Sequence, residues 1–521
     1  MARGKVLTVI DPEHYRDATV RTIATVPVTS ESYRPAAPSD RAPVRRHGSL
    51  LEGTLMTSRT TRKSRHTALG AVGLAAVAAL GLAACSSNKP AASTSNTSTA
   101  ASSSSSASSA PSSPSSGSPA AGGELNGGKD VTLTWWHNAN TDPGKSAFQK
   151  VADDFHAAHP NVTIKVSPIQ NEDIKTKIQV ALQGTPPDIF QQWGGGALAT
   201  QVQSGKIADI SQYTQSWIGD LGKGVAGWQV DGKQYGVPYD YHVVGFWYRT
   251  DLFQKAGISA PPATMDDLFA DITKLKAAGI TPIAVGGKDK WPDAFYYENF
   301  VLKECPKATV TSSLDAKKLD DPCFVKAGDD LKKLLDAKPF QNGFLGTPAQ
   351  QGAGSSAGLV ANGKAAMELQ GDWEMAVMPS LATDKDFASK MGFFPFPSVA
   401  GGQGEPGAAL GGGDGFSCST KAPDACAAFL QYLTSADIES QLVKATAVTI
   451  PSNGKATDAI TDPTLKKVLA YLQGVSYNQL YFDQYLPTNV GNAVNDAVAN
   501  FFAGQGSSAD IAAAAGKAAS Q

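Results

Sequence analysis

The sequence predicts an α/β protein built from two lobes. Strands alternate with helices from residue 131 onward, a second alternation begins near residue 243, and about 390 residues lie between Lys129 and Gln521. A segment of that length is too long for one compact core and suits two. No short-period repeat is visible in the sequence, which argues against a solenoid or a propeller.

The first alternation predicts an open sheet. Apolar or alternating segments typical of strands lie at 131–136, 162–166 and 189–190. Apolar residues at helical spacing predict two helices between them, with Phe148, Val151 and Phe155 in the first and Ile174, Ile178 and Leu182 in the second. Because the order is β-α-β-α-β, we expect ligands to bind beyond the carboxyl ends of these strands.

The second alternation repeats this pattern. Strands are predicted at 243–248 and 280–285, and a short helix at 251–256. Thr264 followed by Asp267 is typical of a capping box, so a further helix is expected to begin there. Similar α/β sequence continues to about residue 396, followed by a Gly-rich stretch and a largely helical C-terminus.

A basic and then apolar segment precedes Cys85. Arg59, Arg62, Lys63 and Arg65 stand before an uncharged run at 68–84, as in a secretory signal. The run is shorter than the roughly 20 apolar residues of a permanent membrane helix. It ends in Leu-Ala-Ala-Cys, which resembles a bacterial lipobox and implies cleavage before Cys85 and a lipid on its sulfur. We therefore expect an exported protein on the outer face of the cytoplasmic membrane, anchored through Cys85.

The segments around the signal have separate interpretations. Since a signal should lie at an N-terminus, we expect translation to start at Met56, which makes residues 1–55 a misassigned extension and 56–84 the lipoprotein signal peptide. Residues 86–123 are almost entirely Ser, Ala, Pro, Thr and Gly. Such a composition has little to bury, so 85–128 is predicted to be the anchored cysteine and a disordered tether.

The charge balance argues against nucleic acid as a partner. The chain has 45 Lys+Arg and 47 Asp+Glu, of which 12 and 6 precede Cys85; the remaining 33 and 41 give a formal net charge of −8. An acidic body without basic runs does not suit nucleic acid or electrostatic adhesion to anionic lipid.

Four cysteines remain after Cys85: Cys305, Cys323, Cys418 and Cys426. An even number in an exported protein predicts disulfides, with three possible connectivities. The pairs close in sequence, Cys305 with Cys323 and Cys418 with Cys426, are favoured. The first would close a loop of about 19 residues, which contributes about 3 kcal/mol in the loop-entropy model. Neither pair has metal-ligand spacing and the seven histidines form no H-E-x-x-H motif, so neither a metal nor a cofactor is predicted.

Several segments, taken in order, resemble one known family. They are Gly-Thr-Pro-Pro-Asp-Ile at 184–189, Asp-Gly-Lys-Gln-Tyr-Gly-Val-Pro at 231–238, Tyr-Arg-Thr-Asp-Leu-Phe at 248–253, Gly-Lys-Ala-Ala-Met at 363–367 with Gly-Asp-Trp at 371–373, and Phe-Leu and Tyr-Leu-Thr within 429–434. Together with the lipobox-like ending, they make the chain similar to the family 1 extracellular solute-binding proteins. These proteins feed carbohydrate importers of the ATP-binding-cassette (ABC) type and include maltose-binding protein.

The resemblance implies a periplasmic-binding-protein-like fold, in which hinge crossings join two lobes and the ligand lies in the cleft between them. By the family's chain order, residues 129–240 and 405–450 form the first lobe, and residues 245–395 and 455–521 the second. The lobes would close over the ligand as hinged bodies. Closure would report occupancy to the membrane permease subunits, and we expect the protein to act as a monomer.

Residues at strand ends are the candidate ligand contacts. Sugars present C–H faces that stack on aromatic rings and hydroxyls that need donors and acceptors. Side chains suited to both lie after predicted strands, at the crossings and in the Gly-rich stretch: Trp136, His137, Asn138, Asn140, Asn171, Gln192, Trp193, Tyr239, Asp240, Tyr241, Trp291, Asp293, Gly413 and Asp414. The resemblance adds Asp372 and Trp373, whose aromatic ring stacks on sugar in the family, and Tyr481 and Asp483 from a stretch that supplies cleft aromatics.

Some of these residues have an equally good structural interpretation. An aromatic side chain near a strand end can lie in the core, which applies to Trp136 and Trp291. His137 suits a local hydrogen bond better than a ligand contact. Trp193, between glutamines and glycines, favours exposure and therefore the ligand.

The predicted function is the capture of a carbohydrate without catalysis. Eight tryptophans and fourteen tyrosines favour a ligand with several stacking faces, hence an oligosaccharide. The alternatives are a secreted carbohydrate-active hydrolase and a sensory or adhesion lipoprotein on the same fold. A glycosidase needs two facing carboxylates, and no catalytic motif accompanies the acidic residues. The G-x-S-x-G match at 354–358 and the G-x-G-x-x-G match at 402–407 lack the required strand and helix and are interpreted as loops.

Overall fold

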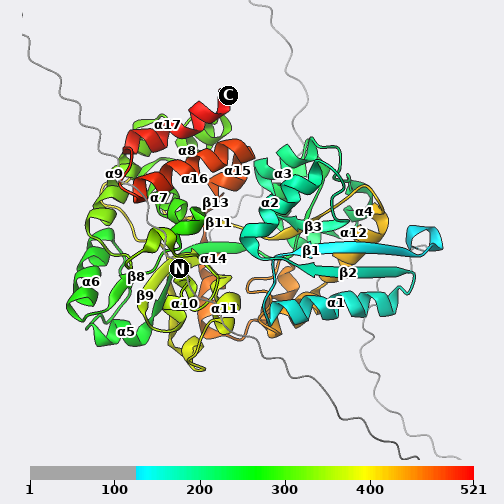
Figure 1. The fold of residues 1–521 in the computed structure, drawn as a ribbon, viewed down its shortest axis with the longest axis horizontal. Coiled ribbons are helices and arrows are strands. Elements are labelled where there is room, and N and C mark those ends of the chain that lie inside the picture. Colours follow the sequence, from blue (N-terminus) through cyan, green and yellow to red (C-terminus); the bar gives the residue numbers. More distant parts are fainter. Residues whose placement is uncertain (1–124) are drawn as a thin grey trace, which may run out of the picture. The chain divides into compact units, whose positions relative to one another are not determined.

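A computed structural model describes residues 125–521. These residues form two α/β lobes, each with its own sheet (Figure 1). The predicted extension, signal peptide, lipid-anchored Cys85 and nearly all of the tether lie outside the described residues.

The sheet of the first lobe has the strand order β2-β1-β3-β12-β6. Its strands are β1 (Val131–His137), β2 (Val162–Pro168), β3 (Ile189–Gln192), β6 (Val237–Pro238) and β12 (Gly415–Cys418). The strands β1, β2 and β3 are parallel, whereas β12 runs antiparallel to β3 and β6. The β-α-β-α-β order predicted from the sequence is confirmed. The helices of this lobe are α1 (Gly144–Ala158), α2 (Asn171–Leu182), α3 (Gly195–Val202), α4 (Ser211–Thr214), α12 (Pro423–Leu433) and α13 (Ala436–Lys444), with a small hairpin of β4 (Gln229–Val230) and β5 (Lys233–Gln234).

The apolar faces predicted from the sequence form the core of this lobe. Phe148 and Phe155 of α1 are buried, and Phe148 packs 5.3 Å from Trp135 of β1 between ring centroids. Trp135 also meets Phe429 of α12 at 4.9 Å in an edge-to-face arrangement. Helix α12 therefore completes a core begun some 290 residues earlier in the chain.

The sheet of the second lobe has the order β13-β11-β7-β9-β8, with β10 also paired to β7. Its strands are β7 (His242–Arg249), β8 (Thr281–Ile283), β9 (Ala365–Gly371), β10 (Met391–Phe394), β11 (Ala408–Gly412) and β13 (Tyr477–Leu480). Helices cover it: α5 (Thr250–Lys255), α6 (Met265–Ala277), α7 (Trp291–Glu304), α8 (Lys307–Asp315), α9 (Pro322–Asp336), α10 (Ser356–Ala361), α11 (Glu374–Val377), α14 (Pro463–Gly474), α15 (Phe482–Tyr485), α16 (Thr488–Phe502) and α17 (Ser508–Ala519). The predicted capping box of Thr264 and Asp267 opens α6.

One segment differs from the expected division of the chain. That division places residues 405–450 in the first lobe, yet β11 lies in the second sheet because it pairs in parallel with β13 and antiparallel with β7. The chain crosses to the first lobe only after Gly412, and β12 then joins the first sheet.

Three crossings connect the lobes. The first, 239–241, joins β6 to β7; the second, 413–414, joins β11 to β12; the third, 449–452, follows α13. They lie beside one another, since Tyr241 N donates to Ile450 O at 2.9 Å and Tyr239 N donates to Asp414 O at 2.9 Å. These hydrogen bonds tie the crossings into one hinge.

Both favoured disulfides are present. Cys305–Cys323 joins the end of α7 to the start of α9, and Cys418–Cys426 joins β12 to α12. Each disulfide therefore lies within one lobe, and neither of them connects the two lobes across the hinge.

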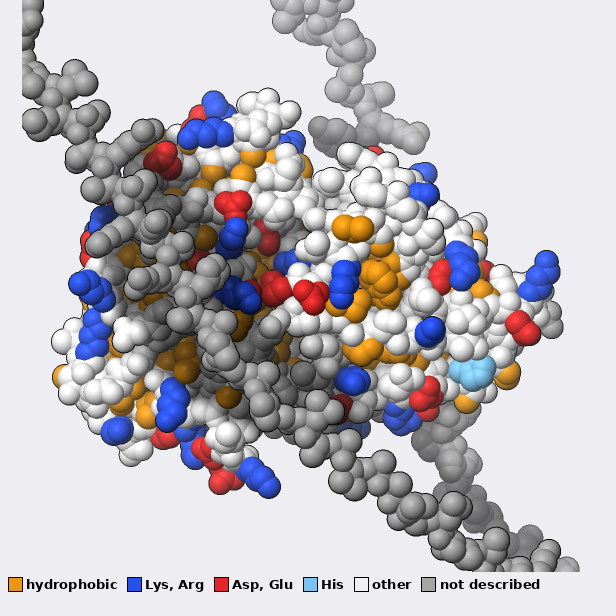
Figure 2. Space-filling view, viewed as in Figure 1, with side chains coloured by type: hydrophobic (Ala, Val, Ile, Leu, Met, Phe, Trp, Pro, Cys, Tyr) orange, Lys and Arg blue, Asp and Glu red, His pale blue; other side chains and the backbone are white. Residues whose placement is uncertain are grey.

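The surface carries mixed charge. Lys and Arg side chains are interspersed with Asp and Glu over the described part of the face in Figure 2. Among residues 125–521, no helix combines the length and the apolar character needed to span a membrane.

Candidate ligand-binding site

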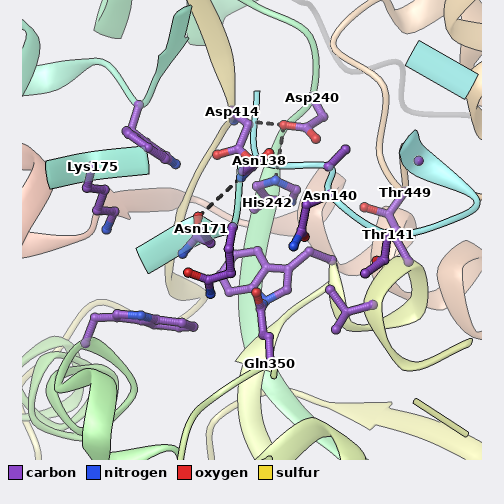
Figure 3. A pocket seen from close by; sticks show the side chains of 18 of the residues that line it. Asn138, Asn140, Thr141, Asn171, Lys175, Asp240, His242, Gln350, Asp414 and Thr449 are labelled. Atoms are coloured by element: carbon purple, nitrogen blue, oxygen red, sulfur yellow. Dashed lines mark hydrogen bonds and ion pairs between the residues drawn. The ribbon is translucent and has the colours of Figure 1, made fainter. Parts of the chain in front are cut away.

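A cleft of about 560 Å³ lies between the lobes beside the crossings (Figure 3). Its walls come from both lobes: the loops after β1 and β2, the start of α2 and Trp193 on one side, and α7, the residues after β9 and α15 on the other. Eleven of the predicted ligand contacts line it, namely Asn138, Asn140, Asn171, Trp193, Tyr239, Asp240, Trp291, Trp373, Asp414, Tyr481 and Asp483. In the first lobe, the contacts that follow parallel strands meet at the carboxyl ends of these strands, as expected for an open sheet.

Aromatic rings form the wall of the second lobe. The ring centroid of Trp373 lies 6.1 Å from that of Trp291 and 6.3 Å from those of Phe295 and Tyr481. Gly371 makes room for Trp373, because a Cβ at that position would lie 2.1 Å from the indole ring. Trp193 supplies an aromatic ring from the first lobe. The cleft therefore offers aromatic faces from both lobes.

A chain of side-chain hydrogen bonds crosses the cleft. Asn138 Nδ2 donates to Asp414 Oδ2 at 3.2 Å and to Asn171 Oδ1 at 3.3 Å. Asn171 Nδ2 donates to Glu172 Oε1 at 2.9 Å, and the same oxygen accepts the indole N–H of Trp291 at 3.2 Å. Since Glu172 lies in the first turn of α2 and Trp291 begins α7, this last bond joins the two lobes.

A second contact joins the lobes, from α2 in the first lobe to α15 in the second. Lys175 Nζ of α2 lies 3.9 Å from Asp483 Oδ2 of α15 and 5.2 Å from the centre of the Trp193 ring. The ammonium group thus contacts both an acid and an aromatic ring of the cleft.

A buried ion cluster forms the hinge side of the cleft. His242 Nε2 lies 3.1 Å from Asp240 Oδ1, and His242 Nδ1 lies 3.1 Å from Asp372 Oδ2. Burial alone would lower the pKa of His242, but the two carboxylates raise it well above its ordinary value. Burial and the charge of Asp240 raise the pKa of Asp414 to about 6.

The same cluster has the spacing of a small cation site. Asp240, His242 and Asp414 offer ligand atoms within 4.8 Å of one another. A metal ligand needs an imidazole nitrogen without a proton, whereas both ring nitrogens of His242 face carboxylates and suit a protonated ring. The geometry therefore favours an ion-paired hydrogen-bond network.

Seven predicted contacts do not line the cleft. Their side chains or backbone make other contacts. These residues are Trp136, His137, Gln192, Tyr241, Asp293, Asp372 and Gly413. Trp136 packs on the cluster under α2, and His137 is buried beside Trp135, where desolvation lowers its pKa to about 3. Tyr241 turns away from the cleft and donates its hydroxyl to Leu221 O at 2.5 Å.

The other four lie just behind the cleft wall. Gln192 is buried and donates to Gln201 Oε1 at 2.9 Å. Asp293 is buried in the first turn of α7, where desolvation raises its pKa well above the ordinary value. Asp372 faces His242, and a Cβ at Gly413 would lie 2.5 Å from Asp240 O. Strand-end position alone does not reveal whether a side chain points outward or into the core.

Several lining residues carried no signal in the sequence: Thr141, Asp173, Lys175, His242, Phe295, Gln350, Gln351, Thr449 and Gln484. Lys175 lies one helical turn after Asn171, and this spacing could have identified it. Gln350 and Gln351 come from an irregular loop, and tertiary packing alone brings them to the cleft.

The segments that match G-x-S-x-G and G-x-G-x-x-G have structural roles. Ser355 caps α10, since its side chain accepts a hydrogen bond from Gly358 N at 3.0 Å. Gly402 and Gly404 lie against the backbone of Lys303 and Leu302 at the end of α7, where a Cβ would clash. Neither segment lines the cleft.

Comparisons with known proteins relate most of the described chain to one family. Residues 138–439 match the family described as bacterial extracellular solute-binding protein. An uncharacterized ABC transporter extracellular-binding protein of Pyrococcus horikoshii is 28% identical over 260 residues, 47% of this chain and 56% of that protein. A second such protein of the same organism is 28% identical over 51% of this chain and 60% of its own length. This chain thus spans little more than half of these relatives. The multiple sugar-binding protein of Streptococcus mutans is 25% identical over 56% of this chain and 68% of that protein.

Solved structures extend the similarity to the whole fold. A protein from a study of xylan utilization by the thermophilic bacterium Caldanaerobius polysaccharolyticus has a TM-score of 0.68 and 27% identity, covering 74% of this chain and 99% of that one. A chitin oligosaccharide binding protein has a TM-score of 0.66 and 26% identity, covering 75% of this chain and all of its own. The two-lobed architecture is therefore shared with these proteins.

Proposed function

The chain belongs to the family of bacterial extracellular solute-binding proteins, and we propose that it captures an oligosaccharide in its interlobe cleft and delivers it to the permease of an ABC importer. Catalysis has no part in this proposal. The similarity to proteins named for sugar and chitin oligosaccharide binding supports a carbohydrate ligand.

The observation that carries the proposal is the combination of side chains around one cleft. Trp193 faces it from the first lobe and Trp291 and Trp373 from the second, with the amides of Asn138 and Asn171 between them. Aromatic faces suit the C–H surfaces of sugar rings, and amides and carboxylates suit their hydroxyls. Because the aromatic rings come from both lobes, a ligand with more than one sugar ring would use them best.

Membrane attachment is a separate part of the proposal. The lipobox-like ending supports a lipid on Cys85, which would hold the sugar-binding body on the outer face of the cytoplasmic membrane. We expect a monomer, since one chain contributes both walls of the cleft.

A thermal-shift screen against monosaccharides and neutral oligosaccharides tests the ligand class. A sugar present at one hundred times its dissociation constant stabilises the folded protein by about 2.7 kcal/mol, which gives a measurable shift. We expect oligosaccharides to raise the melting temperature and their component monosaccharides to have a smaller effect. If no sugar shifts it while an amino acid or peptide does, the carbohydrate assignment is wrong.

A further inference from the structure

Two carboxylates near the hinge accept hydrogen bonds from the crossings, and one imidazole lies between them. Asp372, directly after β9, accepts from Thr449 Oγ1 of the third crossing at 2.5 Å. Asp240, in the first crossing, accepts from the backbone N–H of Asp414 in the second crossing at 2.8 Å. The ring of His242 contacts Asp372 with Nδ1 and Asp240 with Nε2, each at 3.1 Å. All three crossings are therefore linked through this one side chain.

We propose that His242 is a positioning residue for ligand binding, which holds the Asp240 carboxylate toward the cleft and ties it to Asp372 of the second lobe. This inference rests on the proposed function. It adds the residue that sets the geometry of Asp240 and Asp414 in the cleft.

The contacts of Asp240 show what the imidazole positions. His242 Nε2 and Asp414 N both contact Oδ1, so Oδ2 is the oxygen available to a ligand hydroxyl (Figure 3). Asp414 in turn holds Asn138 at 3.2 Å. Without the imidazole, the Asp240 carboxylate keeps only the hydrogen bond from Asp414 N at Oδ1, and the positions of Asp414 and Asn138 loosen with it.

The burial of the cluster makes the imidazole hard to replace. His242 is 3% exposed, Asp240 4% and Asp372 fully buried. A buried carboxylate that loses its charged partner is strongly destabilised. The cluster therefore depends on His242 for charge as well as for shape.

The charge state follows from the same geometry. An imidazole donates to two carboxylates only when both ring nitrogens carry protons. Burial opposes this, but Asp240 and Asp372 keep the pKa of His242 well above its ordinary value. The other charged or titratable groups around the cluster are Asp414, Lys175, Glu439, Tyr239 and Tyr481. Because the pKa of Asp414 is about 6 and that of Glu439 about 8, the titration of His242 is isolated above pH 7 only in a Glu439→Gln background.

Calorimetry of sugar binding tests the positioning role. His242→Asn keeps a donor near the Nδ1 position, toward Asp372, and loses the one toward Asp240. We expect it to weaken binding by at least about tenfold, as for loss of a charged hydrogen bond. The control is His156→Gln, an exposed histidine on α1 outside the cleft lining, which should bind as the wild type does.

Two further measurements separate positioning from general structural support. In the Glu439→Gln background, affinity should be constant from pH 7 to 9, whereas with Asp372→Asn added it should fall as pH rises, because one carboxylate no longer holds the imidazole proton. Nitrogen-15 NMR of the wild-type ring, which needs no variant to fold and no ligand, should show protons on both ring nitrogens at pH 7. A neutral ring at pH 7, or wild-type affinity in folded His242→Asn, would overturn the proposal. Absence of sugar binding by the wild type would instead refute the proposed function.

Discussion

The indole N–H of Trp291 donates a hydrogen bond to Glu172 Oε1 at 3.2 Å, and this bond connects the two lobes across the cleft. Trp291 begins α7 in the second lobe and Glu172 lies in the first turn of α2 in the first. The same glutamate oxygen accepts from Asn171 at 2.9 Å. A side chain expected to stack on sugar is thus held by the opposite wall.

Trp291→Phe should weaken sugar binding roughly threefold to tenfold. The variant keeps an aromatic ring and removes only the N–H that reaches Glu172. Calorimetry on Trp291→Phe, Glu172→Ala and the double variant gives the coupling between the two residues. Losses that simply add would show that the bond across the cleft does not contribute to binding.

Trp373→Ala should weaken sugar binding at least about tenfold with the fold intact, since truncation of a buried aromatic anchor commonly costs about 2 kcal/mol or more. The matched control is Trp217→Ala, because Trp217 lies in the first lobe outside the cleft lining. Equal affinity of folded Trp373→Ala and the control would remove Trp373 from the site.

Gly371→Ala provides a second test of the same ring. A Cβ at this position would lie 2.1 Å from the indole, so the ring must move although no ligand-contacting atom is deleted. We expect reduced affinity and a changed tryptophan fluorescence spectrum. An unchanged spectrum together with wild-type affinity would show that the position tolerates a methyl group.

The sequence revealed the architecture better than the site. The periodicity of Phe148, Val151 and Phe155 identified a helix whose apolar face is buried as expected. It did not reveal that β11 belongs to the second sheet, because its partner β13 lies about 70 residues further along the chain.

The same limitation applies to the cleft. Asn138 and Asn171 follow parallel strands and meet at one sheet edge, which the strand order predicts. His137 precedes Asn138 directly and points into the core, because successive side chains of a strand alternate between the two faces. The sequence gives no signal for His242 because its two partners lie 2 and 130 residues away, and only the fold brings Asp372 to it.

Glu439 should make the protein less stable as pH rises. Burial raises the pKa of this carboxyl to about 8 from 4.5, although it accepts hydrogen bonds from Ser452 Oγ and Asn453 N, each at 2.7 Å. Because the pKa is raised in the folded state, this contribution to the free energy of unfolding is complete below pH 4.5 and is lost as pH rises through about 8.

Urea unfolding between pH 5 and pH 9 checks this, and Glu439→Gln should reduce the slope of stability against pH. Ser452→Ala keeps the titrating group but removes a hydrogen bond that lowers its pKa, so the loss of stability should persist and extend to higher pH than in the wild type. A slope in Glu439→Gln equal to that of the wild type would contradict the assignment.

Cys85→Ser should release the protein from membranes or leave its signal uncleaved. The lipobox-like ending at Cys85 motivates this expectation. Fractionation of cells that express each form, followed by mass spectrometry of the N-terminus, provides the measurement. If the variant is processed and sediments with membranes as the wild type does, anchoring does not depend on Cys85.

The proposed function requires the cleft to bind an oligosaccharide and leave it unchanged. Titration calorimetry of the purified protein with xylo-, cello- and chito-oligosaccharides, followed by chromatography of the recovered sugar, tests both parts at once. We expect saturable binding of one sugar molecule per chain, with the sugar recovered at its original length. Shortened products would establish a hydrolase, and absence of binding across the sugar panel would contradict the carbohydrate assignment.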